Sequence, residues 1–310
     1  MTKIGLLVMA YGTPRSPEDV EAYYTDIRRG RPPTPELLAN LQARYDAIGG
    51  ISPLAQRTEA QRSALEMALE IRMPGAFEVV LGQKHAAPFV EDAVATLADS
   101  GVQRAVGLVL APHYSGFSVG QYHQRASTAA ATVNMEMLGI DNWHLEPTYI
   151  DFLARALADA RAQLPARHRV LFTAHSLPER VLENDPYPEQ LRESAAAVAN
   201  TFAAPDQLDW ELAWQSAGRT PEPWRGPDIL EVIRDLGASQ QFEGVAVCAQ
   251  GFVSDHLEVL YDLDIEAAAL ARECGLAFSR TRSLNDDPVV MGSLAERVVQ
   301  RAGLADQVSG

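Results

Sequence analysis

The alternation of short apolar runs with helical patterns constrains the fold of this chain more than any other feature. Apolar stretches of strand length recur along the 310 residues, and most are followed by a segment with helical periodicity. Such alternation predicts parallel sheets with helices on both faces. The expected strands cover residues 4–10, 77–82, 105–110, a short stretch near 143, 169–173, 210–214, 245–249 and a stretch near 277.

Capping residues and glycines mark the helices between these strands. Ser16 and Pro17 begin the first helix as N-cap and first helical residue, and Gly30 follows its end. The other expected helices are bounded by similar signals. They cover residues 35–48, 58–71, 88–99, 119–138, 148–164, 188–202, 227–236, a stretch after 255, and 286–301.

The elements divide into two series of about four strands, and each series ends in a strand followed by a long helix. We therefore expect an α/β fold of two similar, doubly wound domains with parallel four-stranded sheets. The domains would cover residues 1–147 and 148–310, and the helices at 148–164 and 286–301 would cross over and pack between them. No linker rich in Gly or Ser separates the series, which predicts packed rather than tethered domains.

Composition excludes several classes of function. The hydrophobic share of 47% supports a large core, whereas the net charge of −15 disfavours a nucleic-acid surface or broad adhesion to anionic lipid. The apolar runs are too short to span a bilayer, and the opening residues lack an export signal, so we expect a cytoplasmic protein. The two cysteines, Cys248 and Cys274, fit neither a disulfide framework nor a zinc motif, and they are too few for an iron–sulfur cluster.

An acidic row follows the strand at 245–249. Ser254 or Asp255 is expected to cap the helix, with His256 beside its first turn. Residues four apart share one face of a helix, and like charges there repel unless a cation lies between them. A divalent cation would serve, although a solvated acidic face is the more common explanation of such a row. The carboxylates in question are Glu258, Asp262 and Glu266.

Polar residues also gather where the expected strands end. In open α/β sheets, ligands bind beyond the carboxyl ends of the strands, so these residues would line one site if the domains face each other. Imidazole and carboxylate without thiolate suit Fe(II), Co(II), Ni(II) or Zn(II) held at moderate strength. The strand-end residues are Tyr11, Lys84, His85, His113, Tyr114, His175, Ser176, Gln215, Ser216, Asp255 and His256.

A second candidate chemistry comes from residues 116–120, which match the G-x-S-x-G pattern of serine hydrolases around Ser118. With His175 downstream, they could form a hydrolase site. That motif requires a sharp turn directly from strand to helix, and residues 111–115 intervene here. The hydrolase interpretation is therefore a weaker alternative that ester hydrolysis can test.

Arginines cluster locally in this acidic chain, at Arg28, Arg29 and Arg31, with Arg44 one helix further on. Cations near a helix C-terminus also complement the helix dipole, which explains part of the cluster. The alternative is a rim that binds carboxylates, because arginine pairs with them through two hydrogen bonds. Together with Tyr11, Tyr45 and Tyr122, such a rim would suit a flat aromatic polyanion.

Four motifs together make the sequence resemble the ferrochelatases over nearly its whole length. They are Leu7–Pro14 (LVMAYGTP), Gly49–Leu54 (GGISPL), Thr173–Pro178 (TAHSLP) and Gly251–Glu258 (GFVSDHLE). The resemblance is greatest to the soluble bacterial branch that lacks an iron–sulfur cluster and acts on coproporphyrin III. It implies two Rossmann-like domains with the porphyrin in an active-site cleft between them.

The resemblance also implies roles for individual residues. His175 and Glu258 would be the catalytic, metal-facing pair, and Tyr11 an axial ligand of the product iron. Asp262 and Glu266 would line the path by which the metal arrives, and Lys84 and His85 match a pair near the site with a less defined role. The implied porphyrin-binding residues are Tyr11, Arg28, Arg44, Tyr45, Ser52 and Tyr122.

The implied reaction is insertion of Fe(II) into coproporphyrin III to give coproheme, a step of haem biosynthesis. Iron is then a substrate, and no cofactor and no iron–sulfur cluster is expected. The implied partners are small molecules and, transiently, the enzyme that receives the product; nucleic acid and membrane insertion are not expected, and the protein would be a monomer. A protoporphyrin IX ferrochelatase and a non-catalytic porphyrin or haem carrier remain alternatives.

Overall fold

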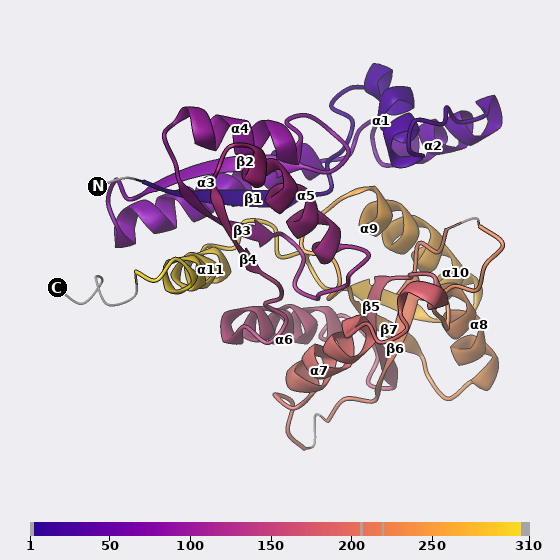
Figure 1. Ribbon diagram of the computed structural model, residues 1–310. Helices are drawn as coiled ribbons and strands as arrows, with labels where there is room; N and C mark the ends of the chain where they lie inside the picture. The colour runs from indigo at the N-terminus through magenta and orange to yellow at the C-terminus, as the bar shows by residue number, and fades with distance from the viewer. Residues whose placement is uncertain (1–2, 205–206, 219, 305–310) are drawn as a thin grey trace. The chain divides into compact units, whose positions relative to one another are not determined.

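The computed structural model describes residues 3–204, 207–218 and 220–304 (Figure 1). It contains two parallel four-stranded sheets, which confirms the expected α/β architecture. Each sheet lies in its own compact unit. Unit 1 comprises residues 1–111, 116–142 and 285–310, and unit 2 comprises residues 112–115 and 143–284.

Unit 1 is built around the first strand. In the sheet order β2-β1-β3-β4, β1 pairs in parallel with both β2 and β3. Its side chains from Leu6 to Met9 are fully inaccessible to solvent, as expected for a continuous apolar run covered on both faces. The strands are β1(Ile4–Ala10), β2(Phe77–Gln83), β3(Arg104–Val109) and β4(Glu136–Ile140).

The helices of unit 1 include two that extend the connection after β1. They are α1 and α2, which contact each other and precede the long helix α3. Thr34 caps α2 by accepting a hydrogen bond from the Leu37 amide at 3.3 Å, and Pro35 occupies its first turn. The elements are η1(Pro17–Asp19), α1(Val20–Ile27), α2(Pro35–Ala47), α3(Leu54–Arg72), α4(Val90–Asp99), α5(Val119–Thr132) and α11(Pro288–Arg301).

Unit 2 repeats the same sheet order, β6-β5-β7-β8, with β5 and β7 in the centre. The interior includes Leu171, Val245 and Val247 from these strands, which pack against apolar side chains of the surrounding helices. The strands are β5(His168–His175), β6(Trp210–Gln215), β7(Gly244–Cys248) and β8(Ala277–Arg280). The helices are α6(Pro147–Arg161), η2(Glu179–Val181), α7(Tyr187–Ala199), α8(Ile229–Ser239), α9(Leu257–Tyr261), the π-helix η3(Asp262–Ala267) and α10(Ala268–Glu273).

The helix that follows the fourth strand of each sheet packs in the other unit. Helix α6 follows β4 in the chain, yet it packs against β7, β8 and α7 in unit 2. Helix α11 follows β8, yet it packs against α3, β3 and β4 in unit 1, where it buries Met291, Leu294 and Val298. The units therefore differ from the ranges expected from sequence, because residues 285–310 group with unit 1 and residues 112–115 and 143–147 with unit 2.

Two sequence-based boundaries in unit 1 are wrong. The fourth strand is Glu136–Ile140 rather than a stretch near Trp143, and α5 ends at Thr132 rather than continuing to residue 138. Asn134 has φ 53°, a left-handed conformation that stops the helix. Met, Glu and Leu in the following strand favour helix locally, but pairing with β3 overrides that preference.

Smaller differences concern helix starts and the membrane question. Helix α3 begins at Leu54, four residues before the expected start, so the Ser52 turn leads directly into it. The Ser52 hydroxyl accepts a hydrogen bond from the Leu54 amide at 3.2 Å. Across the part of the chain that the structure describes, no helix is long and apolar enough to cross a membrane.

Candidate active site

The carboxyl ends of the unit 2 strands carry the residues most suited to metal chemistry. His175 ends β5, Gln215 ends β6 and Arg280 ends β8. The loop after β7 leads into what we call the acidic segment, residues 257–267, which comprises α9 and the π-helix. This arrangement follows the rule that parallel sheets present functional groups at one edge.

His175 and Glu258 form the centre of this group. The His175 Nε2 and Glu258 Oε1 atoms are 3.8 Å apart, and each side chain is about one-third exposed (34% and 36%). The separation exceeds a hydrogen bond, but it admits an ion bound about 2.0–2.2 Å from both atoms. No cluster of three or more His, Cys, Asp or Glu suited to a metal occurs within residues 3–204, 207–218 and 220–304. The pair therefore offers two side-chain atoms, one nitrogen and one oxygen, that face each other.

The ring orientation of His175 suits this role. His175 Nδ1 contacts the carbonyl oxygen of Ser176, which can only accept a hydrogen bond, so Nδ1 carries the proton. Nε2 is then left with its lone pair, available to a metal or a proton. Tyr187, which is buried, donates from its hydroxyl to the His175 carbonyl at 3.3 Å and steadies the backbone at this point.

Glu258 is positioned from two sides. Its backbone amide donates to His256 Nδ1 at 3.1 Å, so His256 is the N-cap of α9, and the expected caps Ser254 and Asp255 are wrong. Its carbonyl accepts a hydrogen bond from Gln215 Nε2 at 3.2 Å. Burial lowers the pKa of His256, which keeps its imidazole neutral and able to accept the amide proton.

The acidic row does not continue along one solvated face. A regular α-helix extends only to Tyr261, and the π-helix that follows closes its hydrogen bonds one residue later. Asp262 is buried, with 6% of its surface exposed, and accepts a hydrogen bond from the Ser216 hydroxyl at 2.5 Å. Glu266 is exposed. The expectation that Glu258, Asp262 and Glu266 share one face of a regular α-helix is therefore wrong, because the π-helix interrupts the row.

The strand ends of unit 1 gather a basic and aromatic group instead. The Tyr11 ring, 43% exposed, lies 4.6 Å from the His85 ring between centroids. His85 Nδ1 is 2.6 Å from a carboxylate oxygen of Asp26 on α1. The Lys84 ammonium lies 5.3 Å from the centre of the buried Tyr122 ring. The structure thus brings Tyr11, Lys84, His85 and Tyr122 together.

The Lys84 ammonium is hydrogen-bonded to a neutral acceptor and has a lowered pKa. Its Nζ donates to Gln121 Oε1 at 2.7 Å, a neutral acceptor, and no carboxylate among the described residues forms an ion pair with it. Burial, followed by repulsion from Arg125 and Arg29, lowers its pKa to about 8. Because burial and these neighbouring cations disfavour the charged form of Lys84, a bound anion would stabilise that charge.

The other predicted porphyrin contacts lie on or beside α1 and α2. Arg28 follows α1, and its Nε donates to the Arg31 carbonyl at 3.2 Å. Arg44 lies in the last turn of α2, and Tyr45 beside it is only 3% exposed. Ser52 is equally buried in the turn before α3. The buried positions of Tyr45 and Ser52 make them packing residues of unit 1, and contact with a ligand stays a prediction.

The strand-end residue His113 and the motif residue Ser118 both have structural roles. His113 is 2% exposed, and its Nε2 lies 2.8 Å from the Ser194 hydroxyl, so it is part of the unit 2 interior. Ser118 is the N-cap residue of α5, and residues 110–117 separate it from the end of β3 at Val109. The direct strand-to-helix turn that a serine nucleophile requires is absent there.

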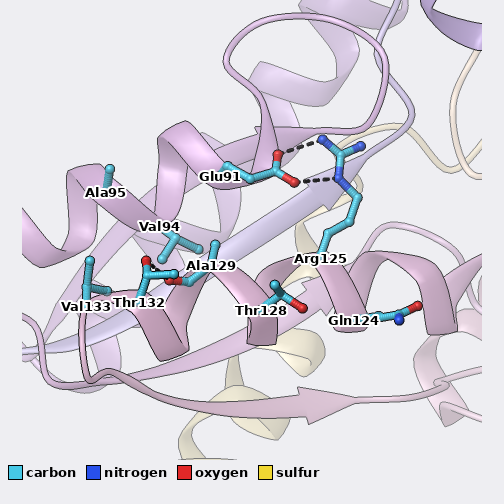
Figure 2. A pocket seen from close by; sticks show the side chains of 9 residues that line it. All are labelled: Glu91, Val94, Ala95, Gln124, Arg125, Thr128, Ala129, Thr132 and Val133. Carbon is cyan, nitrogen blue, oxygen red and sulfur yellow. Dashed lines mark hydrogen bonds and ion pairs between the residues drawn. The ribbon is translucent and has the colours of Figure 1, made fainter. Parts of the chain in front are cut away.

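A hollow in unit 1 is lined by none of the predicted site residues, although its lining residue Arg125 donates a hydrogen bond to the Lys84 carbonyl at 2.8 Å. Figure 2 shows a groove of about 500 Å³ between α4 and α5, with the Glu91–Arg125 ion pair at one end. Small side chains such as Ala95 and Ala129 leave this space. None of the predicted site residues lines it, so the groove is not the candidate active site.

Sequence reasoning missed several residues that hold the site. Asp26 contacts His85, Gln121 contacts Lys84, and Tyr187 contacts the backbone of His175. Arg280 ends β8 and contacts Asp255 and Asp264. The strand-end rule would have found Arg280 if it had also been applied to the last strand, whereas the others have no local signal.

Comparison with known proteins shows the family and the fold of the chain. The ferrochelatase family model matches residues 3–302. The coproporphyrin III ferrochelatase of Bacillus subtilis strain 168 is 43% identical over 308 residues, covering 97% of this chain and 98% of the relative. That of Listeria innocua is 44% identical over 293 residues, covering 92% and 94%. In fold, the chain is similar to SirB from Bacillus subtilis with Fe3+, with a TM-score of 0.59, 11% identity and coverage of 99% and 98%. The chain belongs to the ferrochelatase family.

Proposed function

We propose that this ferrochelatase inserts Fe(II) into coproporphyrin III and releases Fe-coproporphyrin III. The observation that carries the proposal is the His175–Glu258 pair, whose Nε2 and Oε1 atoms are 3.8 Å apart. Full-length relatives at 43–44% identity that are named coproporphyrin III ferrochelatases support the choice of porphyrin. Iron is a substrate of this reaction, and we propose that it needs no cofactor and no iron–sulfur cluster.

The chemistry asks for a weak metal site beside a proton acceptor. Insertion removes two protons from the pyrrole nitrogens and transfers a partly dehydrated metal ion to them. A site with two protein ligands can hold the ion and then release it, whereas a closed four-ligand site would retain it. Neutral imidazole and ionised carboxylate can each also accept a proton. Either His175 or Glu258 can take each role.

The basic and aromatic residues of unit 1 support a substrate rich in carboxylates. Coproporphyrin III carries four propionates, whereas protoporphyrin IX carries two. Each added carboxylate can gain about 1.5–3 kcal/mol from a charge-assisted hydrogen bond to arginine or lysine. We propose that Arg28, Arg44 and Lys84 bind propionates. Tyr45, Ser52 and Tyr122 would support the ring, and Tyr11 would be the axial ligand of the product iron.

The outer carboxylates and the partners complete the proposal. Asp262 and Glu266 would deliver the metal to Glu258, although their different exposure predicts unequal contributions. His85, held by Asp26, would orient Tyr11 through their ring contact. A monomeric state and a transient contact with the enzyme that receives the product stay predictions.

An anaerobic assay of the purified protein with Fe(II) tests the proposal. The expected result is turnover of coproporphyrin III with a kcat/KM at least about tenfold above that of protoporphyrin IX, equivalent to one carboxylate contact. Matched detergent-free conditions remove differences caused by solubility. Binding of porphyrin without turnover would instead make the protein a carrier. Preference for protoporphyrin IX would overturn the choice of substrate, and ester hydrolysis lost in Ser118→Ala would favour a hydrolase.

A further inference from the structure

The acidic segment is tied to both edge strands of the unit 2 sheet. Because the strand order is β6-β5-β7-β8, β6 and β8 form its two edges. At the β6 end, Gln215 binds the Glu258 carbonyl and Ser216 binds the Asp262 carboxylate. At the β8 end, Arg280 binds the Asp264 carboxylate. The segment is therefore held at two widely separated strand ends.

The contact at β8 has the stronger geometry. Arg280 Nε lies 2.5 Å from Asp264 Oδ1, and its Nη2 lies 2.8 Å from Asp264 Oδ2. Such a paired contact fixes the carboxylate in orientation as well as in position. Only 15% of the Arg280 side chain is exposed, so solvent screens this interaction less than it screens a surface pair.

Arg280 also reaches the loop that precedes the acidic segment. Its Nη2 lies 3.5 Å from Asp255 Oδ1, and the Ser283 hydroxyl donates to the same oxygen at 2.8 Å. One guanidinium thus bridges Asp255, which precedes the N-cap His256, and Asp264 inside the π-helix. Glu258 lies between these two attachment points along the chain.

A π-helix needs such support. It is a rare conformation that is retained mainly where surrounding contacts impose it, often at functional sites. Relaxation of the π-helix to a regular α-helix would rotate every residue on one side of the change relative to the other. The short helix α9 carries Glu258 directly before this transition, so any shift there would alter the 3.8 Å separation from His175.

We propose that Arg280 is a positioning residue of the active site, which holds the α-to-π transition and thereby keeps Glu258 at the separation from His175 that a metal requires. The proposal rests on the proposed function, because it assigns the pair to metal transfer. Arg280 itself contacts no reacting atom in this account. Its guanidinium replaces, for Asp255 and Asp264, the cation that would otherwise be needed between neighbouring carboxylates.

Arg169 supplies a matched control. It is the second residue of β5, the strand that His175 ends, and its guanidinium also bridges two carboxylates, those of Asp209 and Glu211. Its side chain is 22% exposed, close to the value for Arg280. Arg169→Met and Arg280→Met therefore remove similar ion-pair networks from the same unit, at opposite ends of the sheet.

The experiment compares both variants in full-length protein by kinetics and by hydrogen–deuterium exchange. Arg280→Met should lower kcat/KM for Fe(II) by about tenfold or more, while the KM for coproporphyrin III stays within about twofold, because only the metal-binding pair is misplaced. Arg280→Lys should recover part of the loss, since an ammonium group replaces the charge but cannot form the two parallel hydrogen bonds to Asp264. Arg169→Met should leave both constants near wild type.

Hydrogen–deuterium exchange tests the positioning role of Arg280 independently of the proposed function. In Arg280→Met, amides of residues 257–267 should exchange faster while those of 288–301 do not change, and Arg169→Met should leave 257–267 unchanged. Unchanged exchange at 257–267, or a kcat/KM for Fe(II) equal to that of Arg169→Met, would overturn the positioning role. If the wild-type protein inserts no metal, the proposed function fails, and the exchange result alone then decides whether Arg280 holds the segment.

Discussion

Units 1 and 2 have the same sheet order but place different chemistry at the carboxyl ends of their strands. In unit 1 these ends carry Tyr11, Lys84 and His85, a basic and aromatic set. In unit 2 they carry His175 and lead into the acidic segment, which contains Glu258. The shared order fixes where functional groups can appear, and the connecting segments decide which groups they are.

Two connections account for most of the difference. The segment from β1 to α3 contains α1 and α2, whereas the segment from β5 to α7 contains only the short helix η2. After the third strand, unit 1 has the regular helix α5 with Tyr122, and unit 2 has α9 interrupted by a π-helix. In unit 1, the connection after β1 therefore contains α1 and α2 and bears arginines. In unit 2, the connection after β7 contains α9 and the π-helix and bears carboxylates.

The largest effect expected from this division concerns His175 and Glu258, the pair proposed to bind the metal in unit 2. His175→Ala should lower kcat by about 100-fold or more, since it removes a ligand that acts at the reacting centre. Affinity for coproporphyrin III should stay near wild type if porphyrin binding depends mainly on unit 1. Steady-state kinetics and fluorescence titration with the porphyrin measure the two quantities. His168→Ala, at the other end of β5, is the control. If His175→Ala lost porphyrin binding as much as kcat, the assignment of metal and porphyrin binding to different units would be wrong.

Glu258→Gln should come close to His175→Ala in kcat, whereas changes at the outer carboxylates should act mainly on the KM for Fe(II). Asp262→Asn should raise that KM by about tenfold, because it alters a buried carboxylate held by Ser216. Glu266→Gln should raise it only about twofold, since the side chain is exposed. Kinetics at varied Fe(II) measure both. Equal and severe losses of kcat at Asp262 and Glu266 would contradict the distinction that their burial suggests.

The arginines of unit 1 should affect porphyrin binding and leave the chemical step intact. Arg28→Ala or Arg44→Ala should raise the KM for coproporphyrin III by roughly tenfold, the loss expected for one charge-assisted hydrogen bond of about 1.5 kcal/mol. Protoporphyrin IX should be affected less, because it has fewer carboxylates. Arg104→Ala, at the start of β3 and paired with Glu136, is the control. A fall in kcat without a change in KM would contradict the assignment of these arginines to porphyrin binding.

The smallest expected effect is a pH dependence of stability that belongs to unit 1. Burial and nearby arginines lower the pKa of Lys84 from 10.5 to about 8. Between these values the unfolded chain binds more protons than the folded one, so the free energy of unfolding should rise as pH increases from 8 towards 10. Denaturant unfolding of wild type and Lys84→Met at pH 7.5 and 9.5 measures the difference. The rise should be smaller in Lys84→Met and unchanged in Lys3→Met, and identical behaviour of the two variants would exclude a lowered pKa at Lys84.

Much of the fold was predictable because its pattern is carried locally. Continuous apolar runs such as Ile4–Ala10 and Gly244–Cys248 have few alternatives to buried strands. The fourth strand was misplaced because Glu136–Ile140 contains good helix formers, and its pairing partner β3 is distant in sequence. No local signal marks the π-helix either, because it depends on contacts such as Arg280–Asp264.

The residues proposed to react were predictable from the sequence, and their supporting contacts less so. The strand-end rule and the family motifs both identify His175, whereas Glu258 comes from the acidic row and the family motifs. Their partners Tyr187 and Gln215 contact backbone carbonyls through folding of the chain, and a sequence pattern does not encode such pairings. Burial was also not predictable for Asp262, which local periodicity placed on the same face as the exposed Glu266.

The exchange of α6 and α11 has a consequence for how the protein forms during synthesis. The strands β1 to β4 of unit 1 precede residues 143–284 of unit 2 in the chain, whereas α11, which buries Met291 and Leu294 in unit 1, follows them. Most of unit 2 must therefore be translated before unit 1 can cover α3 and the faces of β3 and β4. Unit 1 therefore cannot complete its core ahead of unit 2, so the nascent chain carries an uncovered apolar surface until α11 has been made.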